Sequence, residues 1–139
     1  MKNLCLYILI LLLTTHFLLK SEEQKLFVIK TETKTIYDNN KFNLYLYTSV
    51  KDKENLPKIN AEKLSISYIM PQDEPDKKIK LGNTDKLIWV KVSDQEYKML
   101  IASPTIKGKG KSGATVSFTY SNNGKDDLKF EDSIEFELK

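Results

Sequence analysis

Two runs of alternating apolar and polar residues, joined by an Asn-Asn-Gly turn, constrain the fold of this chain more than any other feature. Val116, Phe118 and Tyr120 alternate with hydroxyl-bearing residues before the turn, and apolar residues alternate mainly with charged ones after it. Period-two alternation is typical of strands that bury one face and expose the other. An Asn-Gly pair between two such runs is a strong hairpin signal. The range 114–138 is therefore predicted to form an antiparallel hairpin.

The connection of this hairpin is constrained because both apolar rows must share one face. A simple two-residue loop at 123–124 would send the two rows to opposite faces of the ribbon. We therefore expect a three-residue loop over 122–124, which pairs Leu128 with Phe118, or else a five-residue loop or a bulge. Asp132 also falls on the apolar parity, so a further bulge or an end of pairing is expected near this residue.

The rest of the chain repeats the pattern of short strands separated by turn residues. The clearest alternation runs over 41–50, whereas 87–92 is apolar on both faces and is expected to be central or to lie under a loop. Trp89, within that stretch, is predicted to pack between two sheets. The spacing predicts an all-β fold: an immunoglobulin-like β-sandwich of about 7–9 antiparallel strands, preceded by an amino-terminal hydrophobic signal helix. The other expected strands cover 25–29 with 34–37, 63–70, 78–81 and 97–102.

The amino terminus combines a short basic start with an unbroken apolar run over 4–13, and Glu22 is the first acidic residue. This arrangement is typical of a secretory signal peptide. We expect residues 1–21 to be a signal peptide and 22–139 to be a single β-sandwich domain. The expected location is the secretory pathway: secreted, at the cell surface or in a lumen, which would be the periplasm in a bacterium. The alternative is an uncleaved anchor, although a membrane span needs roughly 20 apolar residues.

Removal of this segment would limit the chemistry that remains. Cys5 and His16, the only cysteine and histidine, both lie within it. Catalysis by Cys/His or Ser/His/Asp arrangements is therefore not available to a mature domain that begins at Glu22. The formal net charge would fall from +3 to about +1. A dedicated nucleic-acid binder needs a concentrated basic face, so no nucleic-acid partner is expected. The sequence thus predicts a protein that is not an enzyme.

Tyr45 and Tyr47 lie on the polar face of the predicted strand over 41–50, where they would form a small exposed aromatic stripe. Tyrosine is enriched at protein interfaces because it supplies contact area and a hydroxyl at low entropic cost. We predict that this stripe contacts a protein partner. The alternatives are that a neighbouring loop covers the two rings, or that they are ordinary strand residues on a wet face.

The segment 106–113 alternates lysine with glycine and is predicted to be a loop. Its Gly-Lys-Ser triplet is not a P-loop, because the glycine required five positions earlier is Thr105 and a strand is expected to follow. Lys107, Lys109 and Lys111 are instead candidates for weak contact with acidic surfaces or membrane headgroups. The alternative is a solvated loop with no binding role.

Two clusters of carboxylates, over 73–76 and 126–132, lack the alternating spacing of a calcium loop. We therefore expect no metal and no cofactor. Taken together, the patterns favour an exported, non-catalytic binding module that engages a protein partner through a sheet face or its end loops. The alternative is a membrane-anchored structural or accessory subunit of an exported or lumenal complex.

Overall fold

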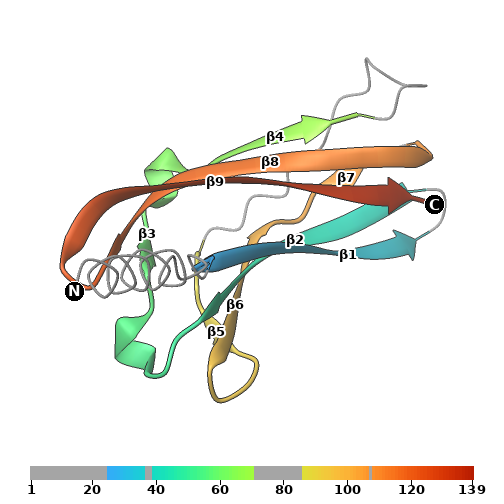
Figure 1. The fold of residues 1–139 in the computed structure, drawn as a ribbon. Coiled ribbons are helices and arrows are strands. Elements are labelled where there is room, and N and C mark those ends of the chain that lie inside the picture. Colours follow the sequence, from blue (N-terminus) through green and yellow to red (C-terminus); the bar gives the residue numbers. More distant parts are fainter. Residues whose placement is uncertain (1–24, 37–38, 71–85, 107) are drawn as a thin grey trace, which may run out of the picture.

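The computed structural model describes residues 25–36, 39–70, 86–106 and 108–139, and most of these lie in strands (Figure 1). They contain no α-helix, so the all-β prediction is confirmed. The expected signal segment and the strand over 78–81 lie outside the described residues. The strands are β1 (Phe27–Ile36), β2 (Asn39–Ser49), β3 (Lys58–Ile59), β4 (Ser65–Ile69), β5 (Val90–Lys91), β6 (Glu96–Ala102), β7 (Thr105–Ile106), β8 (Gly110–Asn122) and β9 (Lys125–Leu138), with short 3-10 helices η1 (Lys53–Asn55) and η2 (Ala61–Lys63).

The strands form two antiparallel sheets. Sheet A has the order β1-β2-β6-β5, and β7 pairs with the first part of β2. In sheet B, β9 runs along one side of β8, while β3 and β4 pair with different parts of its other side. Figure 1 shows β8 and β9 in one layer that faces a second layer containing β1 and β2. The main core cluster takes buried residues from both sheets, so their inner faces pack against each other.

The alternation over 41–50 is confirmed. Phe42, Leu44 and Leu46 of β2 are almost completely buried, while Tyr45 and Tyr47 between them are only half-buried. Because successive side chains of a strand point to opposite faces, β2 gives the core one row and the outer face of sheet A the other.

Phe27 of β1 lies at the centre of the main core. Its ring meets three rings of sheet B at steep angles: Phe118 at a centroid distance of 5.3 Å, Tyr120 at 4.8 Å and Phe130 at 5.2 Å. Edge-to-face pairs of this kind each contribute about 0.5–1.5 kcal/mol beyond the area they bury. The two sheets are therefore joined by one aromatic residue that contacts both strands of the closing hairpin.

A smaller cluster fills the other end of the molecule. Phe42, Ile106 and Leu138 are buried there, and Tyr68 of β4 and Phe136 of β9 pack against them. The Tyr68 hydroxyl is buried and has no hydrogen-bond partner among the described residues. Desolvation raises the pKa of Tyr68 to about 12, because burial disfavours the charged phenolate.

The loop of the β8–β9 hairpin differs from the favoured expectation. Asn122 pairs with Lys125, so the loop has two residues, Asn123 and Gly124. Both have positive φ, at 50° and 75°, as a type I′ turn requires. The predicted three-residue loop is wrong.

A bulge in β9 corrects the parity that this short loop would otherwise invert. The register shifts between Tyr120 and Asn122, so Tyr120 pairs with Leu128, and β9 carries one extra residue where Asp127 has a φ of 53°. The bulge alternative is therefore confirmed. The predicted pairing of Leu128 with Phe118 is wrong by two residues.

Asp132 does not interrupt the ladder, contrary to expectation. It pairs with Val116, and the next residues of both strands pair in register. Its carboxylate lies 3.3 Å from the Lys25 ammonium and also accepts the Ser133 backbone N–H at 2.9 Å. The side chain keeps 34% of its surface exposed. A charged residue fits the inner parity here because it reaches solvent and a cation at the sheet edge.

The segment 87–92 is neither central nor covered by any described element, so this expectation is also wrong. Only Val90 and Lys91 form a strand, β5, at the edge of sheet A. Trp89 does pack against the core as predicted, parallel to the Phe27 ring at a centroid distance of 6.4 Å. Its indole N–H donates to the Pro57 carbonyl at 2.9 Å, which ties this edge to the chain entering β3 of sheet B.

The expected loop over 106–113 is also shorter than predicted. Ile106 ends β7, which pairs with the beginning of β2, and β8 already begins at Gly110. Lys111 therefore lies in a strand, opposite Glu137 of β9. The alternation of lysine and glycine failed to indicate this strand because glycine is usually depleted in strands.

Candidate binding surface

Tyr45 and Tyr47 lie side by side on the outer face of sheet A, the face turned away from sheet B. Their strand, β2, is flanked by β1 and β6, so both rings have cross-strand neighbours. The two rings meet edge to face, with centroids 6.3 Å apart and planes at 67°. The predicted aromatic stripe therefore exists, and no described loop lies over it to bury it fully.

A lysine ammonium lies over each of these rings. The Lys30 ammonium is 4.2 Å from the centre of the Tyr47 ring, and the Lys98 ammonium is 4.8 Å from that of Tyr45. Each contact contributes about 0.5–1 kcal/mol at an exposed site. Lys30 also reaches Glu96 at 3.7 Å, an exposed pair of small energetic value. The stripe is thus two tyrosines between two lysines from neighbouring strands.

The Tyr45 hydroxyl has a defined polar environment. Asn43, two residues earlier on the same face, donates its amide N–H to this hydroxyl at 3.4 Å. The Asn43 amide oxygen in turn accepts the Ser103 hydroxyl at 2.6 Å. The Tyr45 hydroxyl therefore accepts one hydrogen bond and retains its own proton to donate to a partner.

One register row crosses all four main strands of sheet A on this face. Val28 pairs with Tyr47, Tyr47 pairs with Lys98, and Lys98 pairs with Val90. Val28 is 44% exposed and Val90 is 54% exposed. The row therefore presents apolar surface at both edges of the sheet, with the aromatic ring and the lysine between them.

The hollow that the described residues form beside the tyrosines is small. A hollow of about 60 Å³ lies beside Tyr47, bounded among others by Lys25, Val28 and Lys30. This space suits about two water molecules, whereas small-molecule sites usually measure 300–1,000 Å³. The geometry thus suits a broad partner surface better than a small ligand.

The three predicted lysine contacts do not join this surface. Lys107 lies outside the described residues, and Lys109 is exposed between β7 and β8. Lys111 projects on the outer face of sheet B, opposite Glu137 of β9. The structure therefore places Tyr45 and Tyr47 on one outer face of the molecule and Lys111 on the other.

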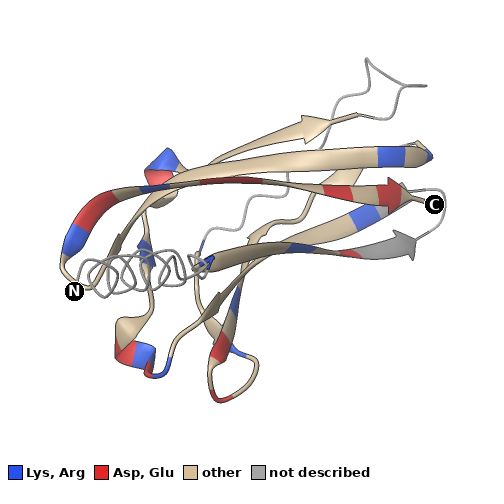
Figure 2. Cartoon of the chain, viewed as in Figure 1, with Lys and Arg blue, Asp and Glu red and all other residues tan. Residues whose placement is uncertain are grey.

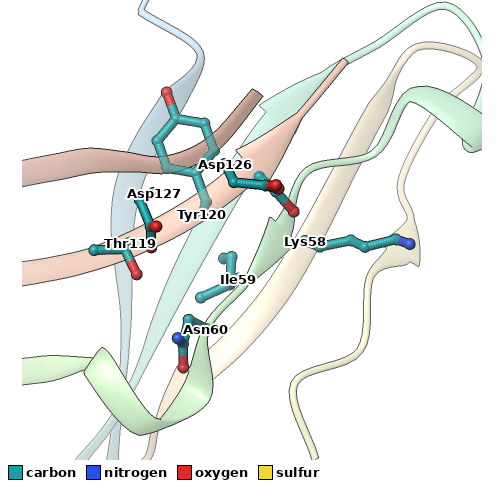
Figure 3. A pocket seen from close by; sticks show the side chains of 8 residues that line it. Lys58, Ile59, Asn60, Thr119, Tyr120, Asp126 and Asp127 are labelled. Atoms are coloured by element: carbon teal, nitrogen blue, oxygen red, sulfur yellow. The ribbon is translucent and has the colours of Figure 1, made fainter. Parts of the chain in front are cut away.

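Larger hollows lie at the turn of the β8–β9 hairpin (Figure 3). One of about 430 Å³ is bounded by β3, the end of β8 and the bulge, and includes Lys58, Asn60, Asp126 and Asp127. Figure 3 shows Lys58 extending its ammonium away from the two aspartates. Asp127 instead lies 3.9 Å from Lys63, and its side chain is 81% exposed. These acids are solvated turn residues whose carboxylates do not converge on a common point.

Metal binding and membrane crossing can both be assessed within the described part of the chain. No group of three or more His, Cys, Asp or Glu residues is arranged to hold a metal ion there. The cluster over 73–76 lies outside it. No helix in the described part is long and apolar enough to cross a membrane. No model of a known protein family matches this chain, and no curated protein matches it.

Sequence reasoning found the tyrosine stripe but missed its lysines. Lys30 and Lys98 are far from Tyr45 and Tyr47 in the chain and reach them only through the pairing of β1 and β6 with β2. The alternation within one strand predicts which face a side chain takes. It carries no information on which residue of another strand lies opposite.

Proposed function

We propose that this protein is an exported, non-catalytic binding module whose outer face of sheet A contacts a protein partner. The observation that carries the proposal is the pair Tyr45 and Tyr47, set edge to face on a central strand with a lysine over each ring. Tyrosine side chains held by their neighbours lose little entropy on binding.

The character of the surface favours a protein over other partner classes. It mixes aromatic, aliphatic and charged side chains, and its positive charges are partly balanced by Glu96 beside Lys30. A nucleic acid would require a concentrated basic face. The tyrosines, with apolar edges and the Tyr45 hydroxyl as a donor, are of the kind enriched in protein interfaces, whereas the two lysines suit the polar rim of such an interface.

We further propose that the fold is immunoglobulin-like. In the constant type of that fold, one sheet has the strand order A-B-E-D and the other C-F-G. Sheet A has the order β1-β2-β6-β5, and β4, β8 and β9 follow the order of the second sheet. The order supports the assignment. The short strands β3 and β7 are additions, and no disulfide joins the sheets because the only cysteine is Cys5.

The binding proposal is tested by the double variant Tyr45→Ser/Tyr47→Ser. A photo-crosslinking residue at the neighbouring position Val28 first captures and identifies the partner in the cells that produce the protein. Binding of that partner to the purified variant is then expected to weaken at least about tenfold, as for loss of a hot spot. The thermal unfolding midpoint should fall by no more than several degrees, because the tyrosines lie outside the core and only their ring and lysine contacts are lost.

The matched control is Ser65→Ala/Ser67→Ala, on the outer face of sheet B. Both serines are exposed and lie on β4, far from the stripe in the topology. This control should bind the partner as the unaltered protein does. Equal affinity of the tyrosine variant, or equal loss in the serine control, would remove the stripe as the binding surface.

The exported location is proposed from the amino-terminal pattern alone. Mass spectrometry of the amino terminus of the protein recovered from its cells decides between the two forms. A first residue near Glu22 supports a free exported domain. An intact Met1 supports the other candidate, a membrane-anchored structural or accessory subunit.

A further inference from the structure

The outer edge of β5 is open among the described residues, and its backbone groups are arranged to accept another strand. Within the described parts of the chain, sheet A ends at β5, and β5 pairs with β6 alone. Val92 donates its N–H to the Glu96 carbonyl at 2.8 Å, which makes these two a hydrogen-bonded antiparallel pair. Because such pairs alternate, Val90 also bonds inward, while the backbone N–H and C=O of Lys91 and Trp89 face outward.

The same edge carries the largest concentration of exposed aliphatic side chains in the described residues. Ile88 is 58% exposed, Val90 is 54% exposed and Val92 is 47% exposed. The three share one side of the segment, because residues two apart in an extended chain point the same way. An open strand edge with a row of exposed aliphatic residues is a template for pairing with another chain.

The segment from Lys86 to Asp94 is complementary to itself in the antiparallel direction. With Val90 placed opposite the Val90 of a second copy, Ile88 lies opposite Val92, and Trp89 lies opposite Lys91. The apolar row then meets an apolar row on the same face. The two ends also match, because Lys86 at the start of the segment faces the turn that carries Asp94, whose side chain is 99% exposed.

The backbone arrangement agrees with this register. Centred on Val90, the antiparallel arrangement makes Trp89 and Lys91 of the two copies hydrogen-bonded pairs. These are the residues whose backbone groups face outward. The two valines at the centre then form a non-bonded pair, in which the Cα atoms approach to about 4.5 Å. We propose that β5 joins the β5 of a second copy of this chain, antiparallel, across a two-fold axis at Val90.

The longest edge strand of the described residues, β9, is protected against this kind of pairing. β9 carries Asp132 on its inner parity, held by Lys25 at 3.3 Å, and an inward-pointing charge is a known guard of edge strands. Its outward row is mostly acidic, with Glu131, Glu135 and Glu137, as Figure 2 shows along that strand. On β5 the inner parity holds Trp89, which packs into the core, and Lys91, which is 58% exposed and lies 3.1 Å from Asp94, so this edge has one lysine where β9 has Asp132 and an acidic outer row.

Pairing at this edge would extend the candidate binding surface. The row from Val28 through Tyr47 and Lys98 ends at Val90. In the dimer it would continue through Val90 of the second copy, and then through that copy's Lys98, Tyr47 and Val28. Two tyrosine stripes would then lie on one face of a single sheet. The proposal does not depend on the stripe's function, since its argument uses only the β5 edge.

Cysteine crosslinking tests the register. Val90→Cys is introduced together with Cys5→Ser, the full coding sequence is expressed, and the recovered protein is treated with a mild oxidant. Two cysteines at a non-bonded antiparallel pair are within disulfide reach. Most of the chain is expected to run as a reducible dimer without reductant. The matched control, Ile88→Cys/Cys5→Ser, places its two thiols about 14 Å apart along the strands and should remain monomeric on the gel.

Sedimentation velocity provides the second measurement. The unaltered protein is expected to dimerise, Lys86→Glu to weaken the dimer because it brings two acidic ends together, and Lys86→Glu/Asp94→Lys to restore it. No crosslink at position 90, equal crosslinks at 88 and 90, or a Lys86→Glu variant as dimeric as the unaltered protein would each overturn the proposal.

Discussion

Phe118 and Phe130 stand directly opposite each other on β8 and β9, with ring centroids 4.8 Å apart and planes at 27°. Both rings face the core, where Phe27 meets them edge to face. This pairing depends on one extra residue near the hairpin turn. Without the bulge at Asp127, the two-residue loop would place Phe118 opposite Lys129 and turn Phe130 outward.

Insertion of one glycine between Asp127 and Leu128 should therefore be among the most damaging single changes in the chain. It would place Phe118 opposite Lys129 and turn the residues of β9 from Leu128 onward to the opposite face, unless the loop itself rearranges. Loss of one buried phenylalanine side chain alone costs about 3–5 kcal/mol. We expect the variant to show no cooperative unfolding transition. The measurements are far-ultraviolet circular dichroism and the near-ultraviolet signal of the packed rings.

Asp127→Gly is the matched control for this insertion. It keeps a single extra residue in β9 and removes the strain of a φ of 53° in a residue other than glycine. Its stability in urea should equal or exceed that of the unaltered protein by up to about 1 kcal/mol. An insertion variant that unfolds at the same urea concentration as this control would show that the single extra residue does not set the register.

The sequence predicted strands well wherever one face alone is buried. Alternation identified β2 and its two faces, because Phe42 and Leu44 enter the core while Tyr45 and Tyr47 do not. The same reasoning could not choose between a three-residue loop and a bulge at the hairpin. Either one restores the parity, and the structure follows the local preference of Asn123-Gly124 for a two-residue type I′ turn, with the extra residue placed in β9.

The failures have a common physical origin. The segment 87–92 is apolar on both faces, and periodicity cannot distinguish a strand covered on both sides from an edge strand that exposes one side. Ile88 and Val90 proved to be exposed, at 58% and 54%. Asp132 was expected to break the ladder because the alternation pattern carries no information on Lys25. This cation is remote in sequence but lies beside the Asp132 carboxylate. Such contacts follow from tertiary structure alone.

Tyr68→Phe should stabilise the protein. The Tyr68 hydroxyl is buried in the smaller core cluster without a hydrogen-bond partner, and an unpaired buried polar group costs about 1–3 kcal/mol. Removal of the hydroxyl leaves the ring and its contact with Phe42, at a centroid distance of 6.2 Å. We expect a gain of about 1 kcal/mol in urea unfolding at neutral pH. Tyr47→Phe, on the exposed face, should show no comparable gain.

The same residue should make stability depend on alkaline pH. The pKa of Tyr68 is raised by desolvation to about 12, from an ordinary value of 10.0. Between these values the unfolded chain loses this proton while the folded chain retains it, so the free energy of unfolding falls as pH rises. The advantage of Tyr68→Phe over the unaltered protein should therefore widen from pH 10 towards pH 12. An advantage that stays constant over this range would contradict the burial of the hydroxyl.

Trp89→Phe should weaken the link between the β5 edge and sheet B. The indole N–H donates to the Pro57 carbonyl at 2.9 Å, and phenylalanine can keep the stacking on Phe27 but not this bond. We expect the free energy of unfolding to fall by about 1–3 kcal/mol. Urea unfolding monitored by circular dichroism measures this change. Ser93→Ala, an exposed change four residues later, should stay within about 0.5 kcal/mol. Equal effects of the two variants would assign no stabilising role to the bond.

Asp132→Val should separate stability from resistance to association. Asp132 occupies the inner parity of β9, and its exposed ion pair with Lys25 is worth at most about 1 kcal/mol. Valine there would join the apolar row and is expected to raise the free energy of unfolding by about 0.5–1 kcal/mol. It would also remove the inward charge that guards a long edge strand.

Static light scattering at increasing concentration should therefore show higher-order association of Asp132→Val that the unaltered protein lacks. Glu131→Val is the matched control, because it adds the same side chain to the outer face of the same strand and leaves Asp132 in place. The inward charge would then still oppose edge pairing, so this control should associate less. The two variants differ only in the face of β9 that carries the valine. Equal association of both would therefore attribute the effect to added hydrophobicity and not to loss of the inward charge.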